Sequence, residues 1–321
     1  MNAVSSPRPP SRNGVGASCV ALQPGPYACL LDFLVARFVH VPRETWVQRL
    51  QSGKVLDEAG QAISLAVAAQ APYWGKGRVF YFREVDTEPA IPVLETVLFQ
   101  DELILVVDKP SGLPVVPSGQ YLQETVLVRQ KKRLGLDSLV PVHRIDRDTA
   151  GLVLFCLQPQ HRRAYSTLFA QRQVEKIYEA LAPYKEDLCF PLTRRTRMGP
   201  GDHFMLQQEQ IGAPNTCTHI ELIEHKQQLA RYRLRPESGH RHQLRVHLMA
   251  LGIPIVNDGL YPTLTPEGSR QHLPLQLLAR SLSFVDPING QKRHFSSQRQ
   301  LMTLAQALSA ANLAAPDGPL G

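Results

Sequence analysis

The sequence lacks the cysteine pattern of a disulfide-stabilised or zinc-stabilised protein. Its five cysteines are widely separated in a chain of 321 residues, and no two of them form a C-x-x-C pair. This spacing excludes a disulfide framework and a thiolate zinc site as the basis of the fold. We expect the thiols to be reduced.

Long apolar runs, export signals and nucleotide-binding motifs are missing too. No stretch approaches the ~18 consecutive apolar residues of a membrane helix, and the N-terminus lacks the charged-then-apolar order of a secretory signal. The pattern G-x-x-x-x-G-K-[ST] does not occur, and Gly14-Val15-Gly16 has no third glycine after it, so no P-loop or dinucleotide-binding enzyme is favoured. We expect a cytoplasmic protein with no membrane segment.

Basic residues are in excess. Lys and Arg total 35 against 28 Asp and Glu, which gives a net charge of +7, and 26 of the 35 are arginine. The planar guanidinium group binds phosphate oxygens through paired hydrogen bonds. The excess therefore indicates a polyanionic partner, with nucleic acid as the first candidate.

Composition divides the chain into five segments. Pro, Gly and Ser at the start, and Ala, Pro and Gly at the end, predict segments that cannot bury enough surface to become ordered. Two amphipathic runs followed by two short strands predict a small module between the first of these segments and a Glu-, Pro- and Thr-rich linker. The predicted segments are a disordered arm (1–26), the small module (27–84), the linker (85–100), the main domain (101–305) and a C-terminal tail (306–321).

The main domain mixes helices and strands. Apolar periodicity predicts helices near 124–134 and 160–170, and strands near 103–107, 152–156, 177–181, 219–225, 229–235 and 277–284. Residues 194–203 contain two glycines and a proline and are expected to form a flexible loop. Strands follow one another too often for regular β-α-β units, so we expect an α+β fold with a mixed or antiparallel sheet.

The densest group of polar residues precedes the apolar run at 152–155. Five charged or ionisable side chains occupy six positions: His143, Arg144, Asp146, Arg147 and Asp148. Charges held beside a core strand are typical of an active site. Asp and Thr also form turns, and Arg–Asp pairs are common on surfaces, so an ordinary turn is the alternative.

A second group lies in residues 235–248, which indicate a strand end, a turn and the start of a helix. Helical phase places Arg245 on the mostly apolar face, beside Leu244 and Leu248. Because an unpaired buried cation costs several kcal/mol, Arg245 needs a carboxylate, and Asp146 is the natural candidate. The alternatives are an irregular segment or an arginine that extends to solvent.

Three histidines lie in the same segment. His240, His242 and His247 have no carboxylate or cysteine partner at the spacing of a zinc site, so we predict no metal.

These motifs resemble the RluA-type pseudouridine synthase family. That family carries H-R-L-D-x-x-T-S-G-L, which residues 143–152 match with Ile145 and Ala150 in place of Leu and Ser. It also has a Lys-x-Tyr strand, a G-R-x-H-Q-[IL]-R-V-H-L helix, and G-x-P-[IL]-x-x-D-x-x-Y. The corresponding segments here are 176–178, 239–248 and 252–261. The resemblance runs from about 101 to 295, with 107–113 as its opening motif.

The resemblance implies an isomerase that converts specific uridines of ribosomal RNA or tRNA to pseudouridine, with the target base flipped out of its stack and no cofactor. Asp146 is then the nucleophile, Tyr178 packs against the target base, and Arg245 keeps Asp146 ionised. Arg144 enters the space left by the base. The residues expected to bind RNA in this domain are Arg144, Arg147, Lys176, Arg241 and His242.

The small N-terminal module resembles the S-four-type RNA-binding module, which presents basic residues from two helices. Arg43, Arg49 and Lys54 match its usual polar positions and are expected to bind RNA. The segment 57–60 departs from the Val-Asn-Gly turn common in that module.

Two other functions compete with the isomerase. One is a non-catalytic RNA-binding or ribosome-assembly protein on the same fold. The other is a hydrolase that uses Asp146 and Asp148 as an acid and base pair, although the sequence gives Asp148 no means of staying protonated. We expect a monomer, with RNA as its partner.

Overall fold

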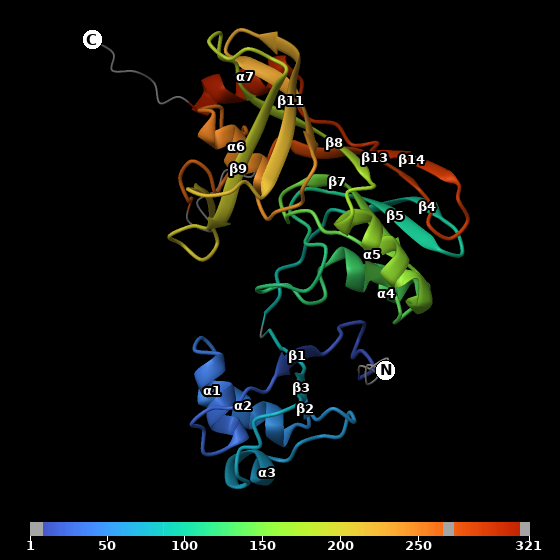
Figure 1. The fold of residues 1–321 in the computed structure, drawn as a ribbon, viewed down its shortest axis with the longest axis vertical. Helices are drawn as coiled ribbons and strands as arrows, with labels where there is room; N and C mark the ends of the chain where they lie inside the picture. Colours follow the sequence, from blue (N-terminus) through green and yellow to red (C-terminus); the bar gives the residue numbers. More distant parts are fainter. Residues whose placement is uncertain (1–8, 86, 266–272, 315–321) are drawn as a thin grey trace. The chain divides into compact units, whose positions relative to one another are not determined.

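The computed structural model describes residues 9–85, 87–265 and 273–314 (Figure 1). The chain forms two compact units. The first unit comprises Met1–Pro89, Pro117–Gln123 and Val128–Asp137, and the second comprises Ala90–Val116, Glu124–Leu127 and Ser138–Gly321. Among the described residues, no helix has the length and apolar character needed to cross a bilayer.

The first unit packs short helices on a three-stranded sheet of order β1-β3-β2. Its elements are β1 (Ser18–Ala21), α1 (Leu30–Arg37), α2 (Arg43–Gln51), β2 (Val55–Leu56), α3 (Leu65–Gln70) and β3 (Arg78–Tyr81). The predicted helix pair and the two predicted strands are present. Trp46 of α2 is fully buried and packs edge-on against Tyr81 of β3, which joins the helices to the sheet.

The start of the chain is ordered where we expected a disordered arm. Residues Ser18–Ala21 pair antiparallel with β3. Val20 and Leu22 are buried in the core of the unit, so a few apolar residues suffice to order a proline-rich segment when a strand edge is free to receive it. The prediction is wrong for this part of the arm. Residues 1–8 lie outside the described residues.

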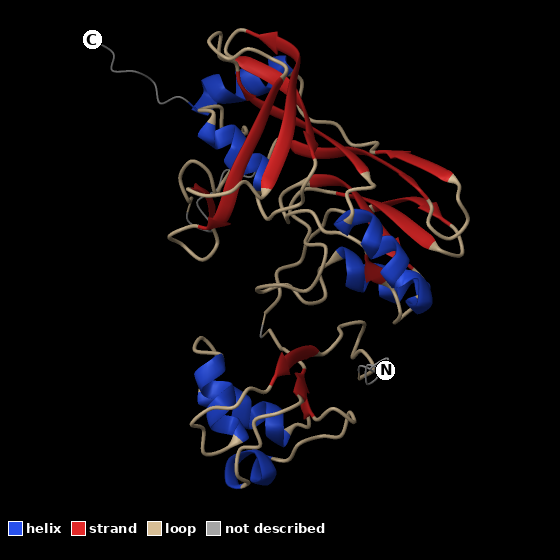
Figure 2. Ribbon diagram, viewed as in Figure 1, coloured by secondary structure: helices blue, strands red, loops and turns tan. Residues whose placement is uncertain are grey.

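The second unit is built on an 11-stranded sheet of order β10-β9-β11-β12-β8-β13-β7-β5-β4, with β14 paired to β13 and β6 to β7 (Figure 2). Its strands are β4 (Thr96–Gln100), β5 (Ile104–Lys109), β6 (Val140–Pro141), β7 (Ala150–Cys156), β8 (Glu175–Pro183), β9 (Leu192–Pro200), β10 (Gln207–Gln210), β11 (Thr216–Lys226), β12 (Leu229–Pro236), β13 (Leu277–Val285) and β14 (Lys292–Ser296). β7 and β13 are parallel and the other pairs described are antiparallel. The predicted α+β fold with a mixed sheet is confirmed.

Helices cover this sheet at two separate cores. The helices of this unit are the short 3-10 turn η1 (Pro159–His161), α5 (Arg162–Ala170), α6 (Gln243–Ala250) and α7 (Leu304–Ala314), whereas most of α4 (Val126–Leu134) belongs to the first unit. Tyr165 and Leu168 of α5 pack on β5 and β7. Leu244 and Leu248 of α6 pack on β8, β11 and β12, so the apolar face predicted for this helix does face the sheet.

Three predicted boundaries in this unit are wrong. The linker ends at β4, and the tail forms α7, whose Leu304 and Leu308 pack beside Leu229. Residues predicted as a flexible loop at 194–203 mostly form β9, which pairs with β10 and β11. The arginines of β9 gave it no apolar alternation, although it is an inner strand of the sheet. Residues 315–321 lie outside the described residues.

One glycine fixes how closely two strands approach. Gly151 is the second residue of β7 and lies beside Ala279 of β13, and its φ is +109°. A Cβ atom there would overlap the backbone of Ala279. Only glycine therefore allows this contact, which sets the exit of the polar segment 143–149 against β13.

Candidate active site

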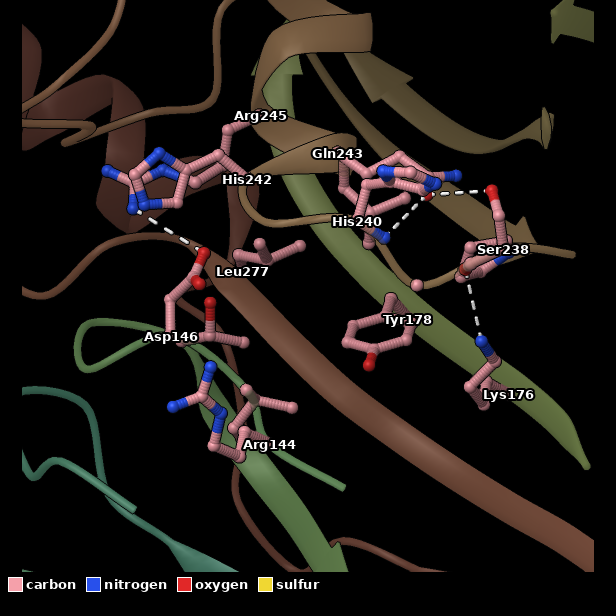
Figure 3. A pocket seen from close by; sticks show the side chains of 15 residues that line it. Arg144, Asp146, Lys176, Tyr178, Ser238, His240, His242, Gln243, Arg245 and Leu277 are labelled. Atoms are coloured by element: carbon pink, nitrogen blue, oxygen red, sulfur yellow. Dashed lines mark hydrogen bonds and ion pairs between the residues drawn. The ribbon is translucent and has the colours of Figure 1, made fainter. Parts of the chain in front are cut away.

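A pocket opens at the centre of the second unit, where several distant segments meet (Figure 3). It receives side chains from the loop before β7, from β8, from the end of β12, from the start of α6 and from β13. The lining residues are Arg144, Ile145, Asp146, Thr149, Lys176, Tyr178, Pro236, Ser238, Gly239, His240, His242, Gln243, Leu244, Arg245 and Leu277. The three residues expected to be catalytic are thus brought together.

The loop that carries Asp146 is hydrogen-bonded to the end of β5 and to the turn that follows it. The Lys109 ammonium group donates to the Arg147 carbonyl oxygen at 2.7 Å, and the Gly112 amide donates to the same oxygen at 2.9 Å. The Ser111 hydroxyl donates to the Asp148 carbonyl oxygen at 2.6 Å. Lys109 is fully buried, and burial lowers its pKa to about 7. Because these hydrogen bonds go to backbone carbonyl oxygens, they hold the loop in place independently of its side chains.

Asp146 presents its carboxylate to the pocket. Its side chain is 28 % exposed, and its Oδ2 lies 3.7 Å from Nη1 of Arg245, whose side chain is 2 % exposed. The predicted pairing of an inward arginine with Asp146 is therefore present as a contact between charges. At 3.7 Å it is too long for a hydrogen bond.

The principal partner of Arg245 is Asp258, which the sequence analysis did not assign. Nε of Arg245 donates to Oδ2 of Asp258 at 2.8 Å, and Nη2 donates to Oδ1 at 2.5 Å. Asp258 Oδ1 also accepts the backbone amides of Leu260 and Tyr261. Burial opposes the charge of Arg245, but the bonds to Asp258 and the charge of Asp146 raise its pKa. Asp258 is the carboxylate within G-x-P-[IL]-x-x-D-x-x-Y, and that position was the available signal.

Tyr178 lies on β8 between β12 and β13, and its ring points into the pocket (Figure 3). Burial, together with the negative charge of Asp146, raises the pKa of its hydroxyl group. The phenol is therefore neutral at pH 7. It offers the pocket a flat, uncharged ring opposite a carboxylate.

Two further polar side chains complete the wall. Lys176 donates to the Ser238 carbonyl oxygen at 3.1 Å, and burial beside Arg172 lowers its pKa to about 8. His242 is buried, has a φ of 58°, and its Nδ1 lies 2.9 Å from the Tyr261 hydroxyl. Burial lowers the pKa of His242 to about 4, so the ring is neutral at pH 7.

Comparison with known proteins agrees with this arrangement. Residues 103–250 match the family model described as RNA pseudouridylate synthase. The dual-specificity RNA pseudouridine synthase RluA of Pasteurella multocida is 32% identical over 66% of this chain and 95% of its own length. The mitochondrial tRNA pseudouridine(32) synthase of Saccharomyces cerevisiae is 31% identical over 51% of this chain and 36% of its own length. This chain belongs to the RluA-type RNA pseudouridine synthase family. It is an isomerase that converts uridine to pseudouridine in RNA.

A solved structure supports the fold. Human RNA pseudouridylate synthase domain containing 1 superposes with a TM-score of 0.54, covering 73% of this chain and all of the human chain, at 20% sequence identity. Identity this low supports the shared fold alone, and the activity follows from the family.

Not all the residues expected to bind RNA line the pocket of this synthase. Arg144, Lys176 and His242 do. Arg147 pairs with Asp148 at 2.9 Å beside the loop, and Arg241 donates to backbone oxygens of residues 204 and 205. Both of these arginines lie outside the lining, and the structure gives each of them a role in holding a loop.

The basic residues of the first unit have protein partners. Arg43 pairs with Asp32 at 2.9 Å, and Lys54 pairs with Glu84. Arg49 is 6 % exposed and lies over the Trp46 ring at 4.9 Å from its centroid, where burial lowers its pKa. So buried a guanidinium is poorly placed to follow an RNA backbone, and RNA binding by Arg49 stays a prediction. The Trp46 ring binds the guanidinium of Arg49 through its face, and the spacing of residues in the sequence did not reveal this contact.

One group of side chains of metal-ligand type lies close together in the described part of the chain: Cys217, His219 and Glu237. Nε2 of His219 already pairs with a Glu237 oxygen at 2.7 Å. Arg172 lies 3.9 Å from the same carboxylate, and Arg195 faces Cys217 across the β9–β11 pair. The Glu237 carboxylate thus already has His219 and Arg172 as protein neighbours.

Proposed function

We propose that this synthase modifies a uridine in an unpaired loop of ribosomal RNA or tRNA, with Asp146 as its nucleophile. The observation that carries the proposal is the Asp146 carboxylate in a pocket, 3.7 Å from a buried arginine that a second carboxylate holds in place. Sequence-specific RNA recognition favours single-stranded loops, whose bases can be turned outward. The yeast relative is named for a tRNA substrate.

The reaction breaks the bond between N1 of the base and C1′ of the sugar and forms a bond between C5 and C1′. The base loses its C5 proton and N1 gains one, so no redox partner is needed. Asp146 can start this by attacking the sugar, by attacking the ring, or by removing a sugar proton. Each route needs an ionised carboxylate, and the positive guanidinium of Arg245 lies 3.7 Å from the carboxylate of Asp146.

We assign Tyr178 the role of stacking against the flipped uracil. Its ring and Asp146 face the same pocket, and its raised pKa keeps the hydroxyl group neutral. A neutral ring stacks on a base without repelling the carboxylate. The raised pKa weighs against Tyr178 as the base that removes the C5 proton, because the phenolate would have to form beside Asp146.

We assign Arg144 the role of entering the space that the flipped base leaves in the RNA. It lines the pocket beside the nucleophile, and flipping costs a few kcal/mol that such an insertion offsets. The intact set of Asp146, Tyr178 and Arg245 gives no support to a non-catalytic protein. A cytoplasmic location, a monomeric state and independence of a cofactor stay predictions.

The test is to incubate total RNA from cells lacking this enzyme with wild type, with Asp146→Asn and with Asp187→Asn, an exposed carboxylate away from the pocket. Pseudouridine is then mapped by carbodiimide-dependent stops of reverse transcription. We expect new stops with wild type and Asp187→Asn and none with Asp146→Asn. If wild type produces no stops although all three proteins bind RNA, the catalytic proposal fails and the RNA-binding alternative replaces it.

A further inference from the structure

An aromatic side chain stands in solvent on a loop beside the pocket. Phe204 lies between β9 and β10, in the yellow segment that follows β9 in Figure 1, and 80 % of its surface is exposed. Its ring lies against the half-buried His203 ring, with the centroids 4.6 Å apart. So exposed a ring contributes little to folding stability. Its position therefore calls for another explanation.

The loop is closed on itself. The Gly201 amide donates to the Leu206 carbonyl oxygen at 3.1 Å, and the Leu206 amide donates to the His203 carbonyl oxygen at 2.8 Å. The Met205 amide donates to Nδ1 of His203 at 3.2 Å. These bonds fix the backbone on both sides of Phe204, so the ring is presented by an ordered turn.

The loop is also fastened to the wall of the pocket at two points. Arg241, between two residues that line the pocket, donates to the Phe204 carbonyl oxygen at 3.3 Å and to the Met205 carbonyl oxygen at 2.8 Å. The Tyr261 hydroxyl accepts the Gln207 amide at 2.8 Å and lies 2.9 Å from Nδ1 of His242, which lines the pocket. The exposed ring is thus held in a fixed relation to the site where the uridine reacts.

We propose that Phe204, supported by His203, is a stacking platform for an unpaired base of the RNA near the target uridine. The proposal rests on the proposed function, in which the RNA enters as an unpaired loop. Once one base of such a loop is flipped, its neighbours lose stacking partners, and aromatic side chains are the usual replacement. Stacking accepts any base, so the platform adds affinity and places the loop without reading its sequence. The guanidinium of Arg241 adds positive charge beneath it.

The experiment compares wild type with Phe204→Ala, Phe204→Leu, Phe204→Trp and Ile211→Ala. Ile211 is fully exposed at the other end of β10 and serves as the matched apolar control. The probe is an RNA stem-loop with a uridine-rich loop that contains one 2-aminopurine, whose fluorescence changes on stacking. Because each altered side chain is exposed, all the variants should fold, and thermal unfolding checks this.

We expect Phe204→Ala and Phe204→Leu to weaken binding between about 5-fold and about 150-fold, the range for loss of one stacked base, and to lose the fluorescence change. Phe204→Trp should keep both, and Ile211→Ala should equal wild type. In turnover on the mapped substrate, Phe204→Ala should raise KM and change kcat little.

Equal binding by Phe204→Ala and wild type overturns the platform, as does a wild type that does not bind the probe. Weakening by Ile211→Ala equal to that by Phe204→Ala also overturns it, because general apolar contact would then be the cause. A wild type that binds with the fluorescence change but modifies no RNA sinks the proposed function and leaves the platform standing.

Discussion

Replacing Asp258 by Asn tests the buried charge pair that supports the site. Arg245 and Asp258 have side chains 2% and 0% exposed and share two hydrogen bonds, of 2.8 Å and 2.5 Å. Removing one partner of such a buried pair costs about 3–5 kcal/mol, because the more exposed Asp146 can replace Asp258 only in part. At about 2–4 °C per kcal/mol for a large domain, Tm should fall by roughly 6–20 °C.

The same change should abolish activity by a specific route. Without Asp258, Asp146 is the nearest carboxylate to Arg245, so the guanidinium should move to bind it directly. The oxygens of Asp146, the proposed nucleophile, would then be occupied by hydrogen bonds from Arg245. We expect kcat to fall while RNA binding, measured by filter retention, stays near the wild-type value.

Two matched variants make this prediction refutable. Glu221→Gln removes a carboxylate that pairs with Arg233 and Arg235 at the surface, and should cost about 0–1 kcal/mol. The double variant Asp258→Asn with Arg245→Gln leaves no buried charge and should be more stable than the sum of the single losses predicts. If Asp258→Asn unfolds in urea at the same midpoint as Glu221→Gln, the argument from burial is wrong.

Three further predictions concern the loop, the pocket wall and the strand contact. Lys109→Met removes the bond to the Arg147 carbonyl oxygen, and a loop displaced by about 1 Å should lower kcat on the order of 100-fold, seen in single-turnover assays as a slower step at saturating RNA. His242 has a folded pKa of about 4 against 6.5 for the free side chain, so the unfolded chain takes up its proton first as the pH falls. Stability should therefore drop between pH 6.5 and pH 4, and urea titrations of His242→Asn should show a smaller drop. Gly151→Ala should cost more than the ~1–3 kcal/mol of backbone strain alone, because its Cβ meets the β13 backbone, whereas Gly290→Ala, at a φ of +74° with open space around it, should cost about 1–2 kcal/mol. Equal losses in calorimetry would count against the close strand contact.

Periodicity predicted the elements whose apolar residues follow one period. The apolar strands β5 and β7 were found in this way, and the helical phase of residues 244–251 correctly turned Arg245 inward. It missed β9, because the residues at 193–197 are arginine or threonine without apolar alternation, and the strand draws its stability from neighbours on both edges. A strand that is stabilised mainly by pairing with its neighbours has no apolar alternation from which the sequence could predict it.

The site was predictable as a set of residues and not as a set of contacts. Ordered motifs named Asp146, Tyr178 and Arg245, and the pocket contains all three. Which carboxylate binds Arg245 depends on the turn at 252–261, whose path no spacing rule fixes. For Arg49, a polar position on a helix did not indicate exposure, because the faces of Trp46 and Tyr81 accept its guanidinium.

The second carboxylate, Asp258, affects how Arg245 can interact with Asp146. If Asp146 were the only partner of Arg245, a bidentate hydrogen bond would occupy both oxygens of the nucleophile and lower its reactivity. Asp258 instead takes Nε and Nη2, which leaves Nη1 at 3.7 Å from Asp146. At that distance the positive guanidinium still attracts the Asp146 carboxylate, yet makes no hydrogen bond that substrate would have to displace. In the proposed mechanism, Asp258 would therefore contribute to reactivity by holding Arg245 close to Asp146 without a hydrogen bond between the two.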